Sequence, residues 1–145
     1  MDNYVVRKAT YEEANGLVSK YIANGILNDS VVLYIGLLDD KVVSQAVAYL
    51  LTKGETSPDE LLLNNTCACI SDLKTKEEYQ NKGYASRLFK YILNDLKSRG
   101  ISKVTLGIDK NNQRNKDMYS NWGFNDYIKT TVEDNISYDW YSKNL

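Results

Sequence analysis

Apolar and polar residues alternate along this chain in two ways, at the spacing of strands and at the spacing of helices. Helical spacing is clearest in Ala85–Arg99, where apolar residues recur every three or four positions up to the stop at Gly100. Lys103–Ile108 places an apolar residue at every second position, which predicts a strand with one buried face. The sequence therefore predicts a chain that mixes strands and helices.

The remaining elements follow from the same periodicities and from the turn residues between them. Tyr11–Tyr21 has a helical pattern that Thr10 can cap, and the polar, glycine-containing stretch Asn24–Ser30 reads as a break after it. Asp39-Asp40 separates two apolar stretches, which predicts a hairpin. Strands are expected at Tyr4–Arg7, Val31–Leu38, Lys41–Leu51, Asn65–Thr75, Phe124–Val132 and Ser137–Lys143, a helix at Asn112–Asn121, and a loop at Thr52–Glu60. The order β-α-ββ-β-α-β-α-β-β is typical of an α/β (α+β mixed sheet) domain, in which helices flank one sheet.

Composition narrows the class of protein. The 145 residues, 43% of them hydrophobic and 26% charged, suit a single domain over residues 1–145 whose core needs no disulfide or metal. A net charge of −1 argues against a nucleic-acid partner. The chain lacks a signal-peptide pattern and an apolar stretch long enough to cross a bilayer, so we expect no membrane partner and a cytoplasmic location.

Cysteine and histidine usage excludes several kinds of site. Cys67 and Cys69 stand two apart in a strand pattern, where side chains project in parallel and cannot easily bridge, so we expect two small buried apolar residues. The chain contains no histidine. That absence removes the commonest general base and every nucleophile that depends on a histidine, and it leaves too few ligands for a zinc site.

The segment Gln80–Ser86 is the first candidate for chemistry. It joins a strand pattern to the start of an amphipathic helix, where free backbone N–H groups and the helix dipole favour an anion. Gly83 allows a positive φ and a close approach of the backbone to a ligand. The segment matches neither known glycine-rich phosphate loop, so on its own an ordinary strand-to-helix turn explains it as well.

A second candidate lies in the later helix pattern. Asn112 and Tyr119 stand seven residues apart, which is two helical turns, so both side chains face the same way. A capping asparagine and a half-buried core tyrosine would give the same pattern.

Together the two segments resemble the cofactor motifs of the GNAT superfamily of acyl-CoA-dependent N-acyltransferases. The family motif Q/R-x-x-G-x-G/A, between a strand and a helix, is similar to Gln80–Ala85 here, and N-x-x-A/N-x-x-L/M-Y-x-x-x-G-F is similar to Asn112–Phe124. The order of elements also resembles that of the family over nearly the whole chain. The resemblance implies a GNAT fold with two splayed central strands, and acetyl-CoA between them as co-substrate, with no metal. It assigns cofactor contacts to Leu73, Lys74, Thr75, Gln80, Asn81, Lys82, Gly83, Tyr84, Ala85, Ser86 and Asn112.

The resemblance also implies a mechanism. An amine attacks the thioester directly through a tetrahedral intermediate, and Tyr119 is the general acid that protonates the departing thiolate. Two positions depart from the common pattern, because Gln80 stands where many members have arginine and Glu77 where many have proline. No base can be carried over from the family: Asp72, Glu78 and a chain of water molecules remain alternatives.

Three functions stay open on the sequence. The first is acetylation of a primary amine on a small molecule, the second is acetylation of a protein N-terminus or lysine, and the third is acyl-CoA binding without catalysis. Carboxylates in the segments expected to shape the acceptor site favour a cationic amine, although a solvated acidic surface would look the same. These carboxylates are Asp29, Glu55, Asp59, Glu60, Glu133 and Asp134. The aromatic residues Tyr127, Tyr138, Trp140 and Tyr141 could form a homodimer interface or pack within one molecule.

Overall fold

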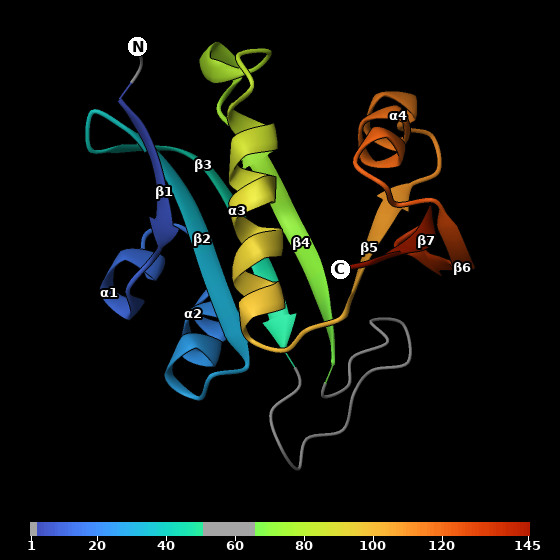
Figure 1. The fold of residues 1–145 in the computed structure, drawn as a ribbon, viewed down its shortest axis with the longest axis horizontal. Coiled ribbons are helices and arrows are strands. Elements are labelled where there is room, and N and C mark those ends of the chain that lie inside the picture. Colours follow the sequence, from blue (N-terminus) through green and yellow to red (C-terminus); the bar gives the residue numbers. More distant parts are fainter. Residues whose placement is uncertain (1–2, 51–65) are drawn as a thin grey trace.

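A computed structural model of the chain describes residues 3–50 and 66–145. Seven strands form one mixed sheet in the order β1-β2-β3-β4-β5-β7-β6 (Figure 1). The strands are β1 (Tyr4–Lys8), β2 (Val31–Leu38), β3 (Lys41–Leu50), β4 (Cys67–Thr75), β5 (Lys103–Asp109), β6 (Asp126–Glu133) and β7 (Ile136–Asn144). All neighbouring strands are antiparallel except β4 and β5, which are parallel. The predicted mixed sheet and its order of elements are confirmed, and the predicted loop Thr52–Glu60 lies outside the described residues.

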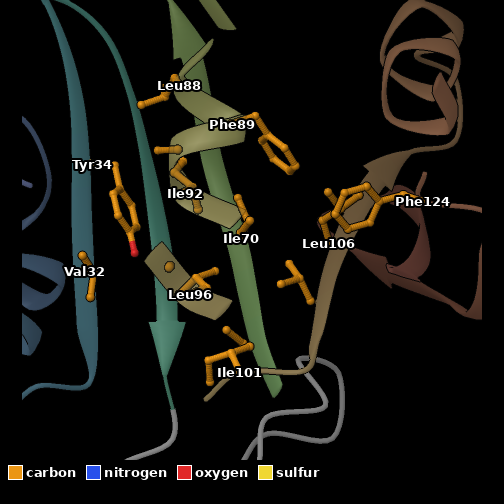
Figure 2. Close-up of a cluster of buried hydrophobic side chains, with 14 of the residues drawn as sticks. Val32, Tyr34, Ile70, Leu88, Phe89, Ile92, Leu96, Ile101, Leu106 and Phe124 are labelled. Atoms are coloured by element: carbon orange, nitrogen blue, oxygen red, sulfur yellow. The ribbon is translucent and has the colours of Figure 1, made fainter. Parts of the chain in front are cut away.

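Helices cover both faces of the sheet. The helical segments are α1 (Tyr11–Ala14), α2 (Lys20–Leu27), the short η1 (Glu77–Tyr79), α3 (Tyr84–Ser98) and α4 (Gln113–Asn121). Four residues of α3, namely Leu88, Phe89, Ile92 and Leu96, pack with Tyr34, Ile70, Leu106 and Phe124 in the larger core (Figure 2). The helices α1 and α2 cover the opposite face, over Leu33, Ile35 and Val47.

One predicted helix is wrong in its extent. The structure has two helices in place of Tyr11–Tyr21, and α2 runs through most of the stretch Asn24–Ser30 that reads as a break. Ser19 begins α2 by accepting a hydrogen bond from the backbone of Ile22. Tertiary packing decides the outcome, because Ile22, Ala23 and Ile26 form an apolar face that lies on the second core.

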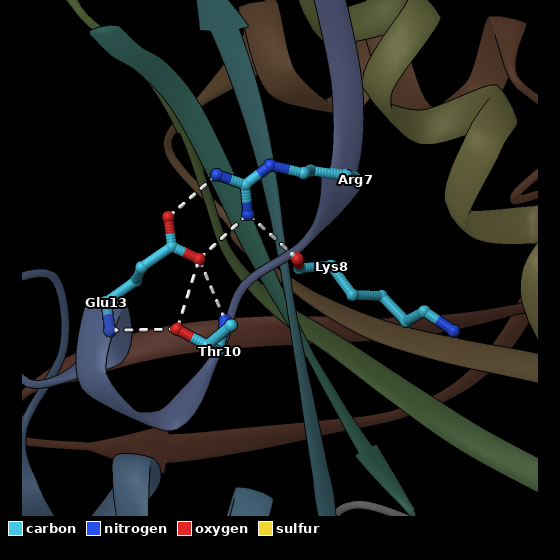
Figure 3. Close-up of polar contacts among 4 residues, drawn as sticks. All are labelled: Arg7, Lys8, Thr10 and Glu13. Atoms are coloured by element: carbon cyan, nitrogen blue, oxygen red, sulfur yellow. Dashed lines mark hydrogen bonds and ion pairs between the residues drawn. The ribbon is translucent and has the colours of Figure 1, made fainter. Parts of the chain in front are cut away.

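The predicted cap at Thr10 is confirmed and belongs to a larger polar cluster (Figure 3). Thr10 and Glu13 form a reciprocal capping box, and Arg7 donates two hydrogen bonds of 2.8 Å to the Glu13 carboxylate. The hydrogen bonds from Arg7, more than any other contact, lower the pKa of Glu13 to about 2. The cluster therefore ties β1 to the start of α1 on the face of the sheet that α1 and α2 cover.

The parallel strands β4 and β5 stay together for only part of their length. Their pairing is confined to Cys67, Ala68 and Cys69 of β4, and both strands continue for several residues beyond it. They diverge toward the end of the sheet where α3 begins and where α4 lies (Figure 1). The expected splayed pair is present, and the edge of β4 that faces β5 has no partner strand beyond Cys69 within the described chain.

The two cysteines behave as expected. Cys67 and Cys69 are both buried and unbridged, and each points to the same face of β4. Burial raises the pKa of the Cys69 thiol to about 12. A thiol with so high a pKa stays protonated near neutral pH and makes a poor nucleophile. Among the helices in residues 3–50 and 66–145, none is long and apolar enough to cross a membrane.

Candidate active site

A cavity of about 890 Å³ fills the gap where β4 and β5 diverge. Because side chains alternate along each strand, the diverging strands open the cavity toward both faces of the sheet. On the α3 face it is bordered by Ile70, Leu106 and Ile108, and on the α2 face by Cys69, Gly107 and Asp109. The cavity thus connects the two faces of the sheet through one opening.

Tyr119 borders this cavity from α4. Its side chain is only 9% exposed, and its ring packs among Phe89, Trp122 and Phe124. The hydroxyl group forms no hydrogen bond with any part of the chain that the structure describes. Burial raises the pKa of this phenol to about 12, so it carries a proton at any pH near neutrality. Tyr119 therefore offers an unused proton donor to whatever occupies the cavity.

The loop Gln80–Ser86 lies at the open end of the divergent strands and leads into α3. Gly83 is the N-cap of α3, with a φ of 81°, and no side chain caps this end of the helix. The first intrahelical hydrogen bond is donated by Arg87 to Gly83. The N–H groups of Tyr84, Ala85 and Ser86 therefore have no intrahelical acceptor, and the positive end of the helix dipole adds to them.

Open space lies in front of this helix end. A Cβ atom added to Gly83 would meet no atom within 4 Å, so glycine is required here by the positive φ and not by crowding. Asn81, Lys82 and Ser86 are exposed on the same loop. An anion could approach the free N–H groups from solvent without moving any part of the loop.

The side chain of Tyr84 anchors the loop and does not face a ligand. It is 7% exposed and stacks on Tyr4, with 4.3 Å between the ring centroids. The Tyr4 hydroxyl donates to the backbone oxygen of Tyr84 over 3.2 Å. Gln80 fixes the other end of the loop by donating to the backbone oxygen of Thr75 over 3.0 Å. Of Tyr84, only the backbone remains available to a ligand.

A cation joins the loop from the neighbouring helix. Arg114, in the first turn of α4, donates a hydrogen bond of 2.9 Å to the side-chain oxygen of Asn81. Asn81 has a φ of 61°, a conformation that asparagine tolerates better than most residues. The contact ties the first turn of α4 to the loop that leads into α3 and adds a guanidinium to that loop.

The wall on the α2 face is aromatic and acidic. Tyr138 and Trp140 of β7 border the cavity, and Trp140 lies directly over Gly107 of β5. A Cβ atom at Gly107 would come within 2.9 Å of the indole ring, so only glycine leaves room for it. Asp72, Asp109 and Glu133 supply three carboxylates, and no lysine or arginine is found among the described residues that border the cavity.

A family model describes this architecture. The model of the Acetyltransferase (GNAT) family matches residues 4–124, which include both splayed strands, the loop and Tyr119. The chain belongs to the GNAT acetyltransferase family. No protein of curated function matches it in sequence.

Solved GNAT structures share the fold over the full length of the chain. One is a GNAT family acetyltransferase from Elizabethkingia anophelis with acetyl-CoA bound, with a TM-score of 0.71, 16% identity and 100% of both chains covered. A GNAT acetyltransferase from Streptococcus pneumoniae gives a TM-score of 0.75 at 14% identity, with 99% of each chain covered. An N-acetyltransferase from Thermoplasma acidophilum in complex with coenzyme A gives 0.69 at 15% identity, again covering 99% of each chain. At these identities the likeness concerns the fold alone.

Only some of the residues predicted from the GNAT motifs border the cavity. Leu73 and Tyr119 border it, whereas Lys74, Thr75 and Asn112 do not. Asn112 is exposed at the start of α4, where its side-chain oxygen accepts the N–H of Asn115 over 3.0 Å. The capping role that the sequence left open is therefore present, and the amide nitrogen of Asn112 is left as a donor for a ligand.

Several residues of the candidate site are not predicted by the GNAT motifs. Asn115 borders the cavity one helical turn before Tyr119, a spacing of four that the sequence could have revealed. Gly107 inside a strand pattern is a signal of close approach, which Trp140 confirms. Arg114 gives no such signal, because its position beside Asn81 depends on how two distant helices meet.

The segments expected to shape the acceptor site are Tyr21–Ser30, the loop after Leu51 and the turn Val132–Ile136, and residues of the first and third border the cavity. Tyr21, Asn24, Asn28 and Ser30 of the α2 region and Glu133 of the β6–β7 turn border the cavity. Asp29 and Asp134 do not, and Glu55, Asp59 and Glu60 lie outside the described residues. Tyr138 and Trp140 face the cavity, whereas Tyr127 is 57% exposed and packs edge-to-face on Tyr141.

Proposed function

We propose that this protein transfers the acetyl group of acetyl-CoA to the primary amine of a small molecule. The observation that carries the proposal is the nearly buried Tyr119 hydroxyl, which borders the cavity and has no hydrogen-bond partner within the described chain. The uncapped N-terminus of α3 lies at the same end of the sheet as α4, which carries Tyr119 (Figure 1). The N-terminus of α3 suits the phosphates of a coenzyme. The Tyr119 hydroxyl suits a leaving group that departs with a negative charge.

The backbone of Gln80–Ala85 would hold the pyrophosphate of acetyl-CoA, with Ser86 at the first turn of α3. The unpaired edge of β4 at Leu73, Lys74 and Thr75 would hydrogen-bond the amide groups of the pantetheine arm, as an added strand would. Asn112 keeps an amide nitrogen that could donate to the same arm. These contacts would place the thioester inside the cavity next to Tyr119.

Arg114 supports this phosphate site although no motif assigns it a role. We expect Arg114→Gln to weaken acetyl-CoA binding about two- to fivefold, because a partly exposed guanidinium beside a phosphate contributes a charge-assisted but screened contact. The loss should shrink as salt is added. Lys97→Gln, in the last turn of α3, removes one positive charge far from the loop and is the matched control. Equal dissociation constants for the two variants, measured by calorimetry, would remove Arg114 from the site.

Each step of the proposed acetyl transfer can be assigned to a particular group around the cavity. Acetyl-CoA supplies an activated acetyl group on a thiol that leaves readily. The amine nitrogen forms the new bond to the carbonyl carbon, and the carbon–sulfur bond breaks. N–H groups on the free edge of β4 would stabilise the oxyanion, and Tyr119 would protonate the departing sulfur. Of the two carboxylates considered as the base, Asp72 borders the cavity whereas Glu78, in η1, does not, which favours Asp72 as the acceptor of the proton that nitrogen loses.

The size of the cavity favours a small acceptor over a protein. A volume of about 890 Å³ is within the range of small-molecule sites, which is roughly 300 to 1,000 Å³. Helix α2 and the β6–β7 turn border the acceptor side from opposite ends. An extended peptide would instead need an open groove along the sheet.

The test is release of free thiol from acetyl-CoA in the presence of small primary amines, with mass spectrometry of the products. We expect a gain of one acetyl group on the amine and an equal amount of free coenzyme A. Binding of acetyl-CoA without turnover of any amine or peptide would favour a non-catalytic acyl-CoA-binding role. Faster turnover of peptides than of free amines would favour the protein-directed alternative.

A further inference from the structure

The three carboxylates of the cavity do not act as one group. Asp72 lies on β4 beside the proposed thioester site, whereas Asp109 and Glu133 border the opposite wall formed by β5, β6 and β7. Asp109 is the cross-strand partner of Tyr138, and Tyr138 is also paired with Thr131, two residues before Glu133. Tyr138 therefore has one carboxylate on each side of it on the same face of the sheet.

The surroundings of this pair suit an organic cation. Tyr138 and Trp140 offer aromatic faces between and beside the two carboxylates, and such faces attract ammonium groups. The Trp140 indole is fixed in place by a hydrogen bond of 2.8 Å from its nitrogen to the Thr131 hydroxyl. No cluster of three or more metal-ligating side chains occurs in the described part of the chain, so the carboxylates are not arranged for a metal ion.

The reacting nitrogen cannot be the cation that these carboxylates recognise. An amine must lose its positive charge before it can attack a carbonyl carbon. A single carboxylate such as Asp72 can take that proton, whereas two carboxylates around the nitrogen would favour its charged form. The nearly buried hydroxyl of Tyr119, which has no partner in the described chain, independently marks where the reacting group must lie. A positive charge held at Asp109 and Glu133 therefore belongs to a second group of the same molecule.

We propose that the acceptor is a diamine, or a longer amine with a second cationic group, whose distal ammonium binds between Asp109 and Glu133 beside Tyr138 and Trp140. This inference rests on the proposed function and names its substrate class. Asp72 then serves the reacting end of the acceptor, and the other two carboxylates serve the distal end. A neutral or anionic group at the distal end would leave both carboxylates without a counter-ion.

Three acceptors of matched length test the proposal: 1,4-diaminobutane, 1-aminobutane and 4-aminobutanoate. All three have a four-carbon chain, and at the distal end they carry an ammonium group, a methyl group and a carboxylate, respectively. We expect kcat/KM for the diamine to exceed that for 1-aminobutane by about 10- to 100-fold, with the amino acid the poorest. Equal values for the diamine and 1-aminobutane would overturn the proposal and leave the acetyltransferase function standing.

Variants that remove the charges of Asp109 and Glu133 test whether these two carboxylates cause the preference for the diamine. Asp109→Asn keeps a side-chain oxygen for the 2.9 Å hydrogen bond that Asp109 accepts from the backbone of Asn111, and Glu133→Gln alters an exposed side chain. In the double variant the preference for the diamine over 1-aminobutane should fall to about threefold or less. Asp126→Asn, on β6 but outside the cavity lining, is the control and should keep the full preference. A preference that survives the double variant would overturn the assignment.

A binding measurement separates this inference from the proposed function. Calorimetry of 1,4-diaminobutane with the protein saturated by coenzyme A involves no acetyl transfer. Binding that weakens at least tenfold in the double variant would support the cation site even if no amine were acetylated, in which case only the transferase function would fail. Binding that is absent, or is unchanged in the double variant, would overturn the cation site.

Discussion

Replacing Gly83 with aspartate should lower the affinity for acetyl-CoA by at least about 100-fold. The new carboxylate would stand at the N-cap of α3, where the pyrophosphate of the co-substrate is proposed to bind. Two unit charges about 4 Å apart near a protein surface repel one another by about 4 kcal/mol, which exceeds the roughly 2.7 kcal/mol needed for a hundredfold loss. Calorimetry of acetyl-CoA with the purified variant measures the effect.

The matched control is Gly83→Asn. Asparagine has the size and shape of aspartate and the same tolerance for the φ of 81°, but it carries no charge. Neither side chain meets a neighbour, because nothing lies within 4 Å of a Cβ atom at this position. Both variants should therefore lose similar stability, about 1 kcal/mol, which thermal unfolding would show. Similar acetyl-CoA affinities for the two variants would mean that no phosphate binds at this loop.

The sequence predicts the fold better than it predicts the extent of its first helix. The strand pattern is strong because β2 and β3 are continuous runs of buried residues, and Asp39-Asp40 marks the turn between them. The first helix fails because α2 contains asparagine and glycine, which favour turns when they are judged locally. Packing of Ile22 and Ile26 on the sheet compensates for that weak propensity, and no local pattern records it.

The residues of the candidate site also fall into two groups: those that the sequence predicts and those that it does not. Gly83 and Tyr119 belong to short motifs within one strand-to-helix turn and one helix, so the sequence already contains their spacing. Asp109, Trp140 and Arg114 come from elements that meet only after the sheet has formed, as in the contact of Arg114 with Asn81, 33 residues away in the chain. Tertiary contacts of this kind are what a single sequence does not show.

The order of the strands explains why the two halves of the site come together. Strand β7 inserts between β5 and β6, so the chain's last strand carries Tyr138 and Trp140 to the edge of β5 that lies away from β4. The α3 face of the opening is built from central elements, and the α2 face depends on the C-terminal hairpin. The co-substrate motifs and the proposed acceptor wall thus come from separate parts of the sequence.

Tyr119→Phe should lower kcat by about 100-fold, while the affinity for acetyl-CoA stays close to that of the wild type. The substitution removes only a hydroxyl group that has no hydrogen-bond partner in the described chain, so packing against Phe89, Trp122 and Phe124 is kept. Loss of a positioned general acid costs about 100-fold at the low end, as expected for a thiol that leaves readily. Steady-state thiol release and calorimetry give the two quantities.

A second tyrosine separates catalysis from stability. Tyr34 is fully buried and donates a hydrogen bond of 2.7 Å to Asp95 of α3, and neither residue borders the cavity. Tyr34→Phe should therefore cost about 1 kcal/mol of unfolding free energy and leave kcat unchanged, the reverse of Tyr119→Phe. Equal kcat values for Tyr119→Phe and the wild type would remove Tyr119 from the mechanism.

The pH dependence sharpens the assignment of Tyr119. Burial raises its pKa to about 12, so the phenol stays protonated well above the ordinary tyrosine value of about 10. The ratio of wild-type to Tyr119→Phe rates should then remain constant from about pH 7 to about pH 10. A ratio that falls toward one above about pH 9 would show a tyrosine with an ordinary pKa, exposed to water and not held in the dry wall of the cavity.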